Sequence, residues 1–337
     1  MKATLQKVRG GRNATVVIVH DDGDLATCKF LLSEYEKNGL SGTIAMIAKR
    51  IIKFPSDEIN DEAVAEWQTL LDSGRFSISC HSRTHVFWGL TDEEEDGLMD
   101  DGGEGIPYHC EAGRITREVR DAGELLRAAF PSQRVRAFVK PGFGRHKNGV
   151  QISDTAYGII KRNYVAMRNT GGGVESIPPK DPYNIRSYMV REGERAEDWI
   201  EYTEAAIAEH GMIVYLFHKI EDNEKGITVA KSKASRLFAH IGKRLGEGEI
   251  YVTSFEEAAL YGEELRAAKL TLTEDIGTAT LALETGLDPD VYDLPLTVRI
   301  DGALGELCAE DGRTVTRQNG AHFIELHPGE KLKLILN

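Results

Sequence analysis

The sequence has few cysteines and no excess of basic residues. Its 337 residues include only Cys28, Cys80, Cys110 and Cys308, which are too far apart for a disulfide framework or a paired-cysteine zinc site, so we expect free thiols. Aspartate and glutamate outnumber lysine and arginine by 54 to 41, which gives a formal net charge of −13. Because nucleic acids and anionic membranes bind basic surfaces, we expect neither as a partner.

Long apolar runs are also absent. No segment is apolar over the length needed to cross a bilayer, and residues 1–9 lack the apolar core of a signal peptide. We therefore expect a cytoplasmic protein, or a secreted one whose signal peptide is absent from this sequence. The length predicts one barrel-sized domain and a smaller second one.

One apolar run ends abruptly in carboxylates. Residues 16–19 are all branched and apolar, as in a parallel strand covered on both faces, and Asp21, Asp22 and Gly23 follow after His20. Helical spacing then continues to a stop at Gly39. Ligands usually meet the C-terminal ends of parallel strands, so the two acids are candidates for chemistry. The structural alternative is a turn followed by a helix N-cap.

The same alternation of strand and helix repeats along the chain. Further strands are predicted at residues 43–48, 76–80, 135–139, 164–167, 212–217 and 250–253. Helices are predicted at residues 61–71, 115–130, 150–162 and 196–210, after Thr228, and from Ser254 onward. Residues 91–107, rich in acids and glycine, are expected to form a mobile surface loop. About seven such repeats predict an α/β barrel or a barrel-like sheet.

The pattern changes at about Leu270. Period-two runs broken by Asp-Gly and Asn-Gly pairs predict strands at residues 278–283, 296–300, 314–316, 321–326 and 331–336. We therefore divide the chain into a barrel domain, residues 1–266, and a small antiparallel β-sandwich, residues 267–337. A lid on the barrel, an oligomer contact and a carbohydrate-binding surface remain alternative roles for the sandwich.

Three predicted strands end in residues that can bind a metal or transfer protons. His81 and His85 directly follow one strand, Asp21 and Asp22 another, and His218 a third. Two imidazoles and a carboxylate, with positions left for water, form a hydrolytic metal site. Alone, the histidine pair is a weak signal for a metal and is better explained by bonds to nearby backbone.

Together these residues resemble a known family, the metal-dependent polysaccharide deacetylases of the chitin, chitooligosaccharide and peptidoglycan deacetylase type, which are carbohydrate esterases. Residues 19–23, Val-His-Asp-Asp-Gly, resemble the family's first motif, and residues 81–85, His-Ser-Arg-Thr-His, match its second. Leu216-Phe217-His218 matches the last motif, Leu-x-His. The resemblance spans roughly residues 14–262 and implies a distorted (β/α)7 barrel.

The resemblance also implies a site. Asp22, His81 and His85 would bind a divalent metal, expected to be zinc, with cobalt or nickel as alternatives, while Asp21 would be the general base and His218 the general acid.

Three further residues are assigned to the substrate. Leu216 would face the acetyl methyl group, and Gly142 and Lys140 are predicted to lie beside the substrate and its oxyanion. The expected partners are a saccharide substrate and, in a homo-oligomer, further copies of the chain.

Two motifs depart from the family pattern. Val139 stands where the family has an arginine that orients the base, so Lys140 or Arg145 is predicted to supply the missing charge. The family has an Asp-Trp segment after the next strand, predicted here at residues 164–167. That segment is also absent, and residues 168–170, Arg-Asn-Thr, follow the strand instead.

The leading functional hypothesis is hydrolytic deacetylation of an N- or O-acetylated saccharide. A catalytically weak sugar-binding protein on the same scaffold and a hydrolase of a small non-sugar amide remain alternatives. Because a binding protein needs no separate base and acid, retention of Asp21 and His218 favours an enzyme.

Overall fold

A closed barrel of parallel strands forms the larger part of this computed structural model, which describes residues 1–85, 112–142, 154–303 and 305–336. Its strands are β2 (Ala14–His20), β3 (Gly42–Met46), β4 (Phe76–Cys80), β5 (Ala137–Val139), β6 (Ala166–Thr170), β7 (Ile185–Met189), β8 (Met212–Phe217) and β11 (Ile250–Thr253). Neighbours pair in the order β11-β2-β3-β4-β5-β6-β7-β8, and β2 also pairs with β8, which closes a ring of seven. The predicted (β/α)7 barrel is therefore confirmed.

One strand of the ring differs from the expectation. β7 is absent from the predicted strands, because its sequence Ile-Arg-Ser-Tyr-Met mixes polar and apolar residues shortly after a glycine- and proline-rich stretch. The predicted strand at residues 250–253 exists as β11, but it pairs with residues 14–17 of β2 as an extra strand beside the ring.

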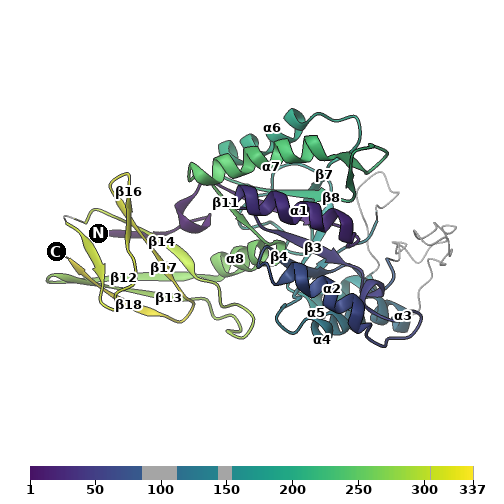
Figure 1. Ribbon diagram of the computed structural model, residues 1–337. Helices are drawn as coiled ribbons and strands as arrows, with labels where there is room; N and C mark the ends of the chain where they lie inside the picture. Colours follow the sequence, from purple (N-terminus) through teal and green to yellow (C-terminus); the bar gives the residue numbers. More distant parts are fainter. Residues whose placement is uncertain (86–111, 143–153, 304, 337) are drawn as a thin grey trace.

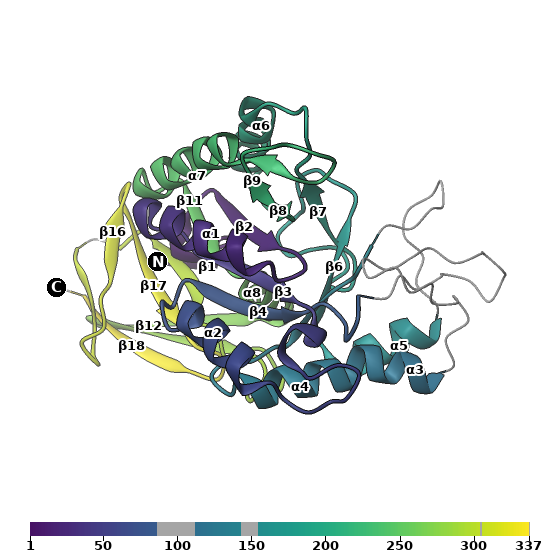
Figure 2. The ribbon, with the colours of Figure 1, turned by 45° about the vertical axis from the view of Figure 1, so that its right-hand side comes forward.

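Helices surround the barrel (Figures 1 and 2). They are α1 (Leu25–Asn38), α2 (Asp61–Leu71), α3 (Ala112–Thr116), α4 (Ala122–Ala129), α5 (Asp154–Asn163), α6 (Ala196–Glu209), α7 (Lys231–Gly246) and α8 (Phe255–Ala267). The predicted stop of α1 at Gly39, which has a φ of 69°, and the predicted cap of α8, where Ser254 accepts a hydrogen bond from Glu257 N, are both present. The start of α1 is also capped, because Asp24 accepts a hydrogen bond from Thr27 N. The helix expected at residues 115–130 is interrupted by a π-helical turn, Arg117–Asp121, between α3 and α4.

Two apolar layers hold the barrel together. Side chains that alternate along the strands, such as Val17 and Val19, pack in one cluster with Ala45 and Ala137, while Val16 and Ile18 belong to the layer that meets the helices. Small residues suit the crowded interior of a seven-stranded ring. The C-terminal strand ends are thereby held in fixed positions around one mouth.

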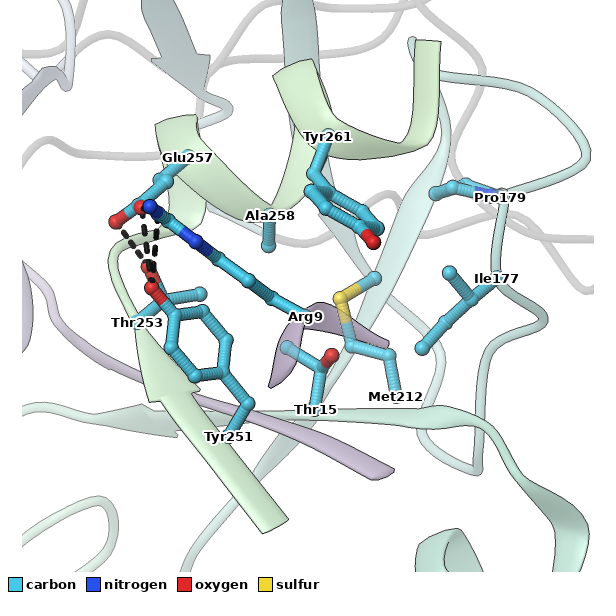
Figure 3. A pocket seen from close by; sticks show the side chains of 10 residues that line it. All are labelled: Arg9, Thr15, Ile177, Pro179, Met212, Tyr251, Thr253, Glu257, Ala258 and Tyr261. Atoms are coloured by element: carbon cyan, nitrogen blue, oxygen red, sulfur yellow. Dashed lines mark hydrogen bonds and ion pairs between the residues drawn. The ribbon is translucent and has the colours of Figure 1, made fainter. Parts of the chain in front are cut away.

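The opposite, N-terminal end of the barrel is closed (Figure 3). Arg9 Nη1 lies 2.6 Å from Glu257 Oε1, and Tyr251 donates a hydrogen bond to the same carboxylate at 3.1 Å. The cavity beneath, lined by Met212 and Tyr261 among others, measures only about 10 Å³, which is room for about one water molecule. A substrate therefore cannot enter through this cavity.

The C-terminal region contains two four-stranded antiparallel sheets, β1-β14-β17-β16 and β12-β13-β18-β15 (Figure 1). The strands are β1 (Lys2–Leu5), β12 (Lys269–Asp275), β13 (Thr278–Glu284), β14 (Leu296–Asp301), β15 (Leu307–Ala309), β16 (Thr316–Gln318), β17 (Ala321–Leu326) and β18 (Lys331–Leu336). One core joins the sheets, with Leu281 and Leu334 from one and Val298 and Ile324 from the other. This is the expected sandwich, although its first strand comes from the N-terminus of the chain. The domain boundary at residues 266 and 267 stays a prediction.

Some expectations concern residues outside the described ranges. These are the mobile loop at residues 91–107, the beginning of the helix at residues 150–162, Cys110 and Arg145. Within the described ranges, no helix combines the length and the apolar character required of a membrane span.

Candidate metal centre

The candidate site residues gather at the C-terminal mouth of the barrel. Asp21 and Asp22 directly follow β2, His81 follows β4, and His218 follows β8. Asp22 has a φ of 71° and His85 a φ of 61°, in the left-handed region where residues other than glycine are uncommon. Because such conformations persist only where the surroundings impose them, the loops at these strand ends are held tightly.

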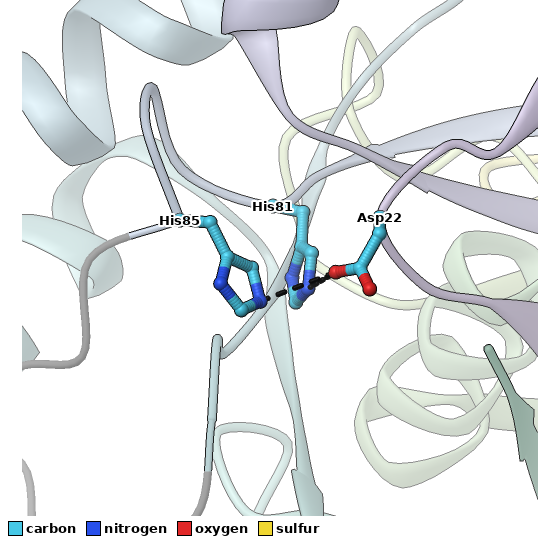
Figure 4. Close-up of side chains that lie close together, drawn as sticks. All are labelled: Asp22, His81 and His85. Atoms are coloured by element: carbon cyan, nitrogen blue, oxygen red, sulfur yellow. Dashed lines mark ion pairs between the residues drawn. The ribbon is translucent and has the colours of Figure 1, made fainter. Parts of the chain in front are cut away.

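Asp22, His81 and His85 converge on one point (Figure 4). One ligand atom from each side chain lies within 4.8 Å of the others. Asp22 Oδ1 is 3.4 Å from His81 Nε2 and 3.2 Å from His85 Nε2. Burial raises the pKa of the Asp22 carboxyl, but contact with the two imidazoles outweighs burial and holds it well below its usual range. Asp22 is therefore ionised.

These residues fit a divalent cation. His81 Nδ1 lies 2.8 Å from the carbonyl oxygen of Val139, which can only accept a hydrogen bond, so Nδ1 carries the proton. In the neutral imidazole, Nε2 then presents a lone pair toward Asp22 Oδ1, and both atoms are buried without a hydrogen-bond partner among the described residues. Two acceptors that face each other repel unless a cation or a proton lies between them. Carboxylate and imidazole ligands are those that zinc prefers.

A buried glutamate holds the histidine loop, and the sequence analysis missed it. Glu118, in the π-helical turn, is 4% exposed and accepts hydrogen bonds from the backbone N–H groups of Arg83 and Thr84 and from the Thr84 hydroxyl. Within the loop, His85 N donates to Ser82 Oγ at 2.9 Å. Glu118 therefore fixes the loop that carries both imidazoles, as π-helical turns at functional sites often do.

Asp21 is paired with an arginine from another strand. Arg168 Nη2 lies 2.7 Å from Asp21 Oδ2, and both side chains are buried. Arg168 Nη1 also donates to Ser187 Oγ, which in turn donates to the carbonyl oxygen of Asn169. The missing charge beside Asp21 was expected from Lys140 or Arg145, but Arg168 on β6 supplies it. The departure at residues 168–170 was visible in the sequence, whereas its link to Asp21 was not.

A cavity of about 100 Å³ connects the proposed site residues. Its lining includes the following members of the predicted site: Asp21, Asp22, His85, Lys140, Gly142, Leu216 and His218. Arg168, Thr170, Met189 and Ile227 complete it. The structure thus places predicted base, acid and substrate residues around one space next to the candidate metal ligands.

Two bases in this cavity are shifted toward their neutral forms. Burial lowers the pKa of the His218 imidazole, although the charges of Asp21 and Asp22 oppose the shift. Burial, together with the positive charge of Arg168, lowers the pKa of Lys140 to about 7. Shifts of this kind are common in active sites.

Comparison with known proteins gives likenesses of fold only. No family model matches the chain, and no curated protein matches it. The fold is similar to solved CE4 structures. One is the Xyl-CE4 domain of a multidomain xylanase from the hindgut metagenome of Trinervitermes trinervoides, with 14% identity over 73% of this chain and 89% of that chain and a TM-score of 0.44.

Two further solved structures show the range of these proteins. A family 4 acetyl xylan esterase from Clostridium thermocellum, in complex with a cobalt ion, is 16% identical over 74% of this chain and 92% of that chain, with a TM-score of 0.42. BA3943, a CE4 family pseudoenzyme from Bacillus anthracis, is 13% identical over 73% of this chain and 65% of that chain, with a TM-score of 0.41. Because esterases and a pseudoenzyme are found at the same low sequence identity, these likenesses say nothing about the activity of this chain.

Proposed function

We propose that the chain is a metal-dependent hydrolase that removes acetyl groups from an N- or O-acetylated saccharide. The observation that carries this proposal is the convergence of Asp22, His81 and His85 within 4.8 Å beside a cavity that Asp21 and His218 also line. The saccharide as substrate class rests on the motif resemblance at residues 19–23, 81–85 and 216–218.

Asp22, His81 and His85 would hold the metal, which we propose to be zinc, with cobalt or nickel as alternatives. When bound, such an ion polarises a carbonyl group and lowers the pKa of water to about 7. The hydrogen bond from His81 Nδ1 to the Val139 carbonyl keeps Nε2 free to bind it.

Asp21 is proposed as the general base. The guanidinium of Arg168, with Nη2 at 2.7 Å, fixes Oδ2. Oδ1 is buried without a hydrogen-bond partner among the described residues and is therefore free to accept a proton from the attacking water. The two oxygens of this carboxylate thus have different tasks.

His218 is proposed as the general acid. It lies at the end of β8 and lines the same cavity as Asp21; burial lowers the pKa of its imidazole, and the negative charges of Asp21 and Asp22 oppose that shift. A protonated His218 would give its proton to the leaving amine or sugar hydroxyl. A base and an acid on different strand ends are what hydrolysis needs and what simple binding does not.

The cavity suits a small acyl group. Leu216, Met189 and Ile227 give it an apolar side for the acetyl methyl, while Lys140 and Gly142 lie where they can approach the carbonyl oxygen. An acyl group much larger than acetyl would not fit a cavity of about 100 Å³.

The test combines metal analysis with acetate release. We expect protein purified without chelator to contain one divalent transition metal per chain, and to release acetate from acetylated xylan or from oligomers of N-acetylglucosamine. Chelation should abolish turnover and zinc, cobalt or nickel should restore it. Protein that contains no such metal and cannot be activated by any of the three ions would disprove the proposal. Turnover of simple acetamides but of no sugar would instead identify a small-amide hydrolase.

A further inference from the structure

A second, larger cavity lies at the other end of the barrel from the candidate metal centre. Its volume is about 430 Å³, and its lining comes from the sheet β1-β14-β17-β16 and from the barrel segments next to it. Figure 1 shows this sheet beside the barrel. Asn13, His210 and Gly248, which precede β2, β8 and β11, contribute to it. The cavity therefore belongs to the N-terminal strand ends, whereas Asp21 and His218 follow C-terminal ends. Its volume lies within the usual range for small-molecule sites.

The lining of this cavity is cationic. Lys7, Arg12 and Arg299 line it, and its described lining contains no aspartate or glutamate. Lys7 is exposed and forms no ion pair among the described residues, while Arg12 donates to the Gly248 carbonyl and Arg299 binds Asp301 through Nε and Nη2. In a chain with a net charge of −13, a lining with three cationic side chains and no carboxylate favours the binding of an anion.

The remaining lining is suited to a sugar ring. Gln318 and Asn319, at the turn between β16 and β17, offer side-chain amides that both donate and accept hydrogen bonds. Phe323 offers a partly exposed aromatic ring. The ring packs closely against Gly11, where a Cβ atom would lie 2.5 Å from Phe323 Cε1. Amides beside an aromatic face match the hydroxyl groups and C–H face of a saccharide.

We propose that this cavity binds a saccharide unit that carries an anionic group, either a carboxylate or a phosphate. The cations Lys7 and Arg299 would bind the anionic group, and Gln318, Asn319 and Phe323 would bind the sugar. The site is separate from the proposed deacetylase site, so it would hold a second ligand or a distant part of a long substrate. It does not depend on the proposed hydrolytic activity.

The proposal is tested by calorimetric titration of the full chain with glucuronic acid, glucose 6-phosphate, glucose and inorganic phosphate. We expect at least one of the two acidic sugars to bind, about tenfold or more tighter than glucose and than inorganic phosphate. The preferred acidic sugar then tells whether the natural anionic group is a carboxylate or a phosphate. Binding should weaken as salt is added, because the attraction is partly electrostatic.

Variants locate the bound sugar. Lys7→Gln combined with Arg299→Gln should weaken binding about tenfold or more, since it removes two charges from the cavity. Arg317→Gln is the matched control: Arg317 lies in the same sheet and, like Arg299, is paired with one carboxylate, Glu306, but it does not line the cavity, so binding should be unchanged.

Several results would overturn the proposal. One is failure of both acidic sugars to bind, and another is equal weakening by the cavity and control variants. Inorganic phosphate binding as tightly as glucose 6-phosphate would show a plain anion site without sugar recognition. Loss of binding in His85→Ala, with the cavity variants unaffected, would place the sugar at the metal centre instead.

Discussion

Arg168 Nη2 lies 2.7 Å from Asp21 Oδ2, and its strand neighbour in the β5–β6 ladder is Val139. The two facts belong together, because Val139 stands where the resemblance places a base-orienting arginine. The arginine thus lies on the neighbouring strand β6, at the position paired with Val139 of β5, and it still contacts Asp21, the candidate base. The missing arginine is thus no argument against catalysis by this chain.

The first prediction concerns this pair. Arg168→Met should leave the Asp21 carboxylate buried without its cation and without the contact that fixes Oδ2, so turnover should fall about 10²-fold. Arg168→Lys should recover part of the loss, because it keeps the charge but not the planar donor pair. The measurement is kcat/KM for acetate release.

Arg186→Met is the control for that experiment. Arg186, on the neighbouring strand β7, is paired with the buried Glu175 outside the cavity, and its own side chain is 46% exposed, so the variant loses an arginine–carboxylate pair without touching the site. It should lose some stability and keep turnover near the wild-type level. If both variants lose turnover equally, Arg168 is only a structural residue.

The second prediction separates metal binding from proton transfer. His81→Ala should abolish metal retention, because it removes one of three ligands. Asp21→Asn should keep the metal and abolish turnover, since Asp21 is assigned as base and its isosteric amide still fills the space. Metal content after desalting and acetate release, measured on the same samples, test both statements. Loss of metal in Asp21→Asn would make Asp21 a ligand and refute the division of roles.

The third prediction concerns Glu118, which accepts hydrogen bonds from Arg83 N, Thr84 N and the Thr84 hydroxyl. Glu118→Gln should weaken metal affinity about 10- to 100-fold, the usual effect of losing an outer-shell partner, because the loop that carries His81 and His85 loosens. Competition with a chelator measures the affinity. Glu124→Gln, at an exposed carboxylate of α4 that is paired with Arg120, is the control and should leave the affinity unchanged.

The fourth prediction is a pH-dependent gain in stability. Lys140 is buried, and its pKa in the folded protein is lowered to about 7, so between that value and its unfolded pKa the unfolded state binds one more proton. The free energy of unfolding therefore increases with pH between about pH 7 and the unfolded pKa. Below about pH 7 it stays at its lower value, because the ammonium group is charged and buried. Lys140→Met should therefore stabilise the protein, by about 2–3 kcal/mol more at pH 6 than at pH 9. Urea unfolding of chelator-treated protein at the two pH values measures this. Equal gains would show that Lys140 has an ordinary pKa.

Local signals in the sequence predicted most of the barrel. The apolar run of β2, the Ser254 cap and the stop at Gly39 each depend on residues close in sequence, and each lies where expected. β7 was missed because its five residues mix polar and apolar side chains, and its strand character depends on pairing with β6 and β8.

The candidate site was also predictable only in part, because some of its contacts join residues that are far apart in the sequence. Strand ends placed Asp22, His81 and His85 together, since parallel strands of one barrel end at one mouth. The partners of these residues depend on register and on packing across the barrel: Arg168 lies 147 residues from Asp21, and Glu118 lies 34 residues from Thr84. No local pattern relates residues so far apart.

The last prediction concerns removal of the sandwich by truncation at about Leu270. Three connections bind it to the barrel. β1 pairs with β14, Tyr261 of α8 belongs to the core of the sandwich, and Arg134 forms a bidentate ion pair with Asp293. The fragment 1–269 would leave β1 without its partner and expose the apolar face of α8.

We therefore expect the fragment 1–269 to be insoluble, and coexpression with residues 270–337 to restore soluble protein, because the covering surface is then supplied in a second chain. Solubility, size-exclusion chromatography and metal content measure the outcome. A soluble, monomeric fragment with normal turnover on a small acetylated substrate would contradict the covering role and make the sandwich an accessory domain. Loss of turnover only on long polymers would make it a surface that binds the substrate, consistent with a sugar site at the cavity beside Phe323 and Arg299.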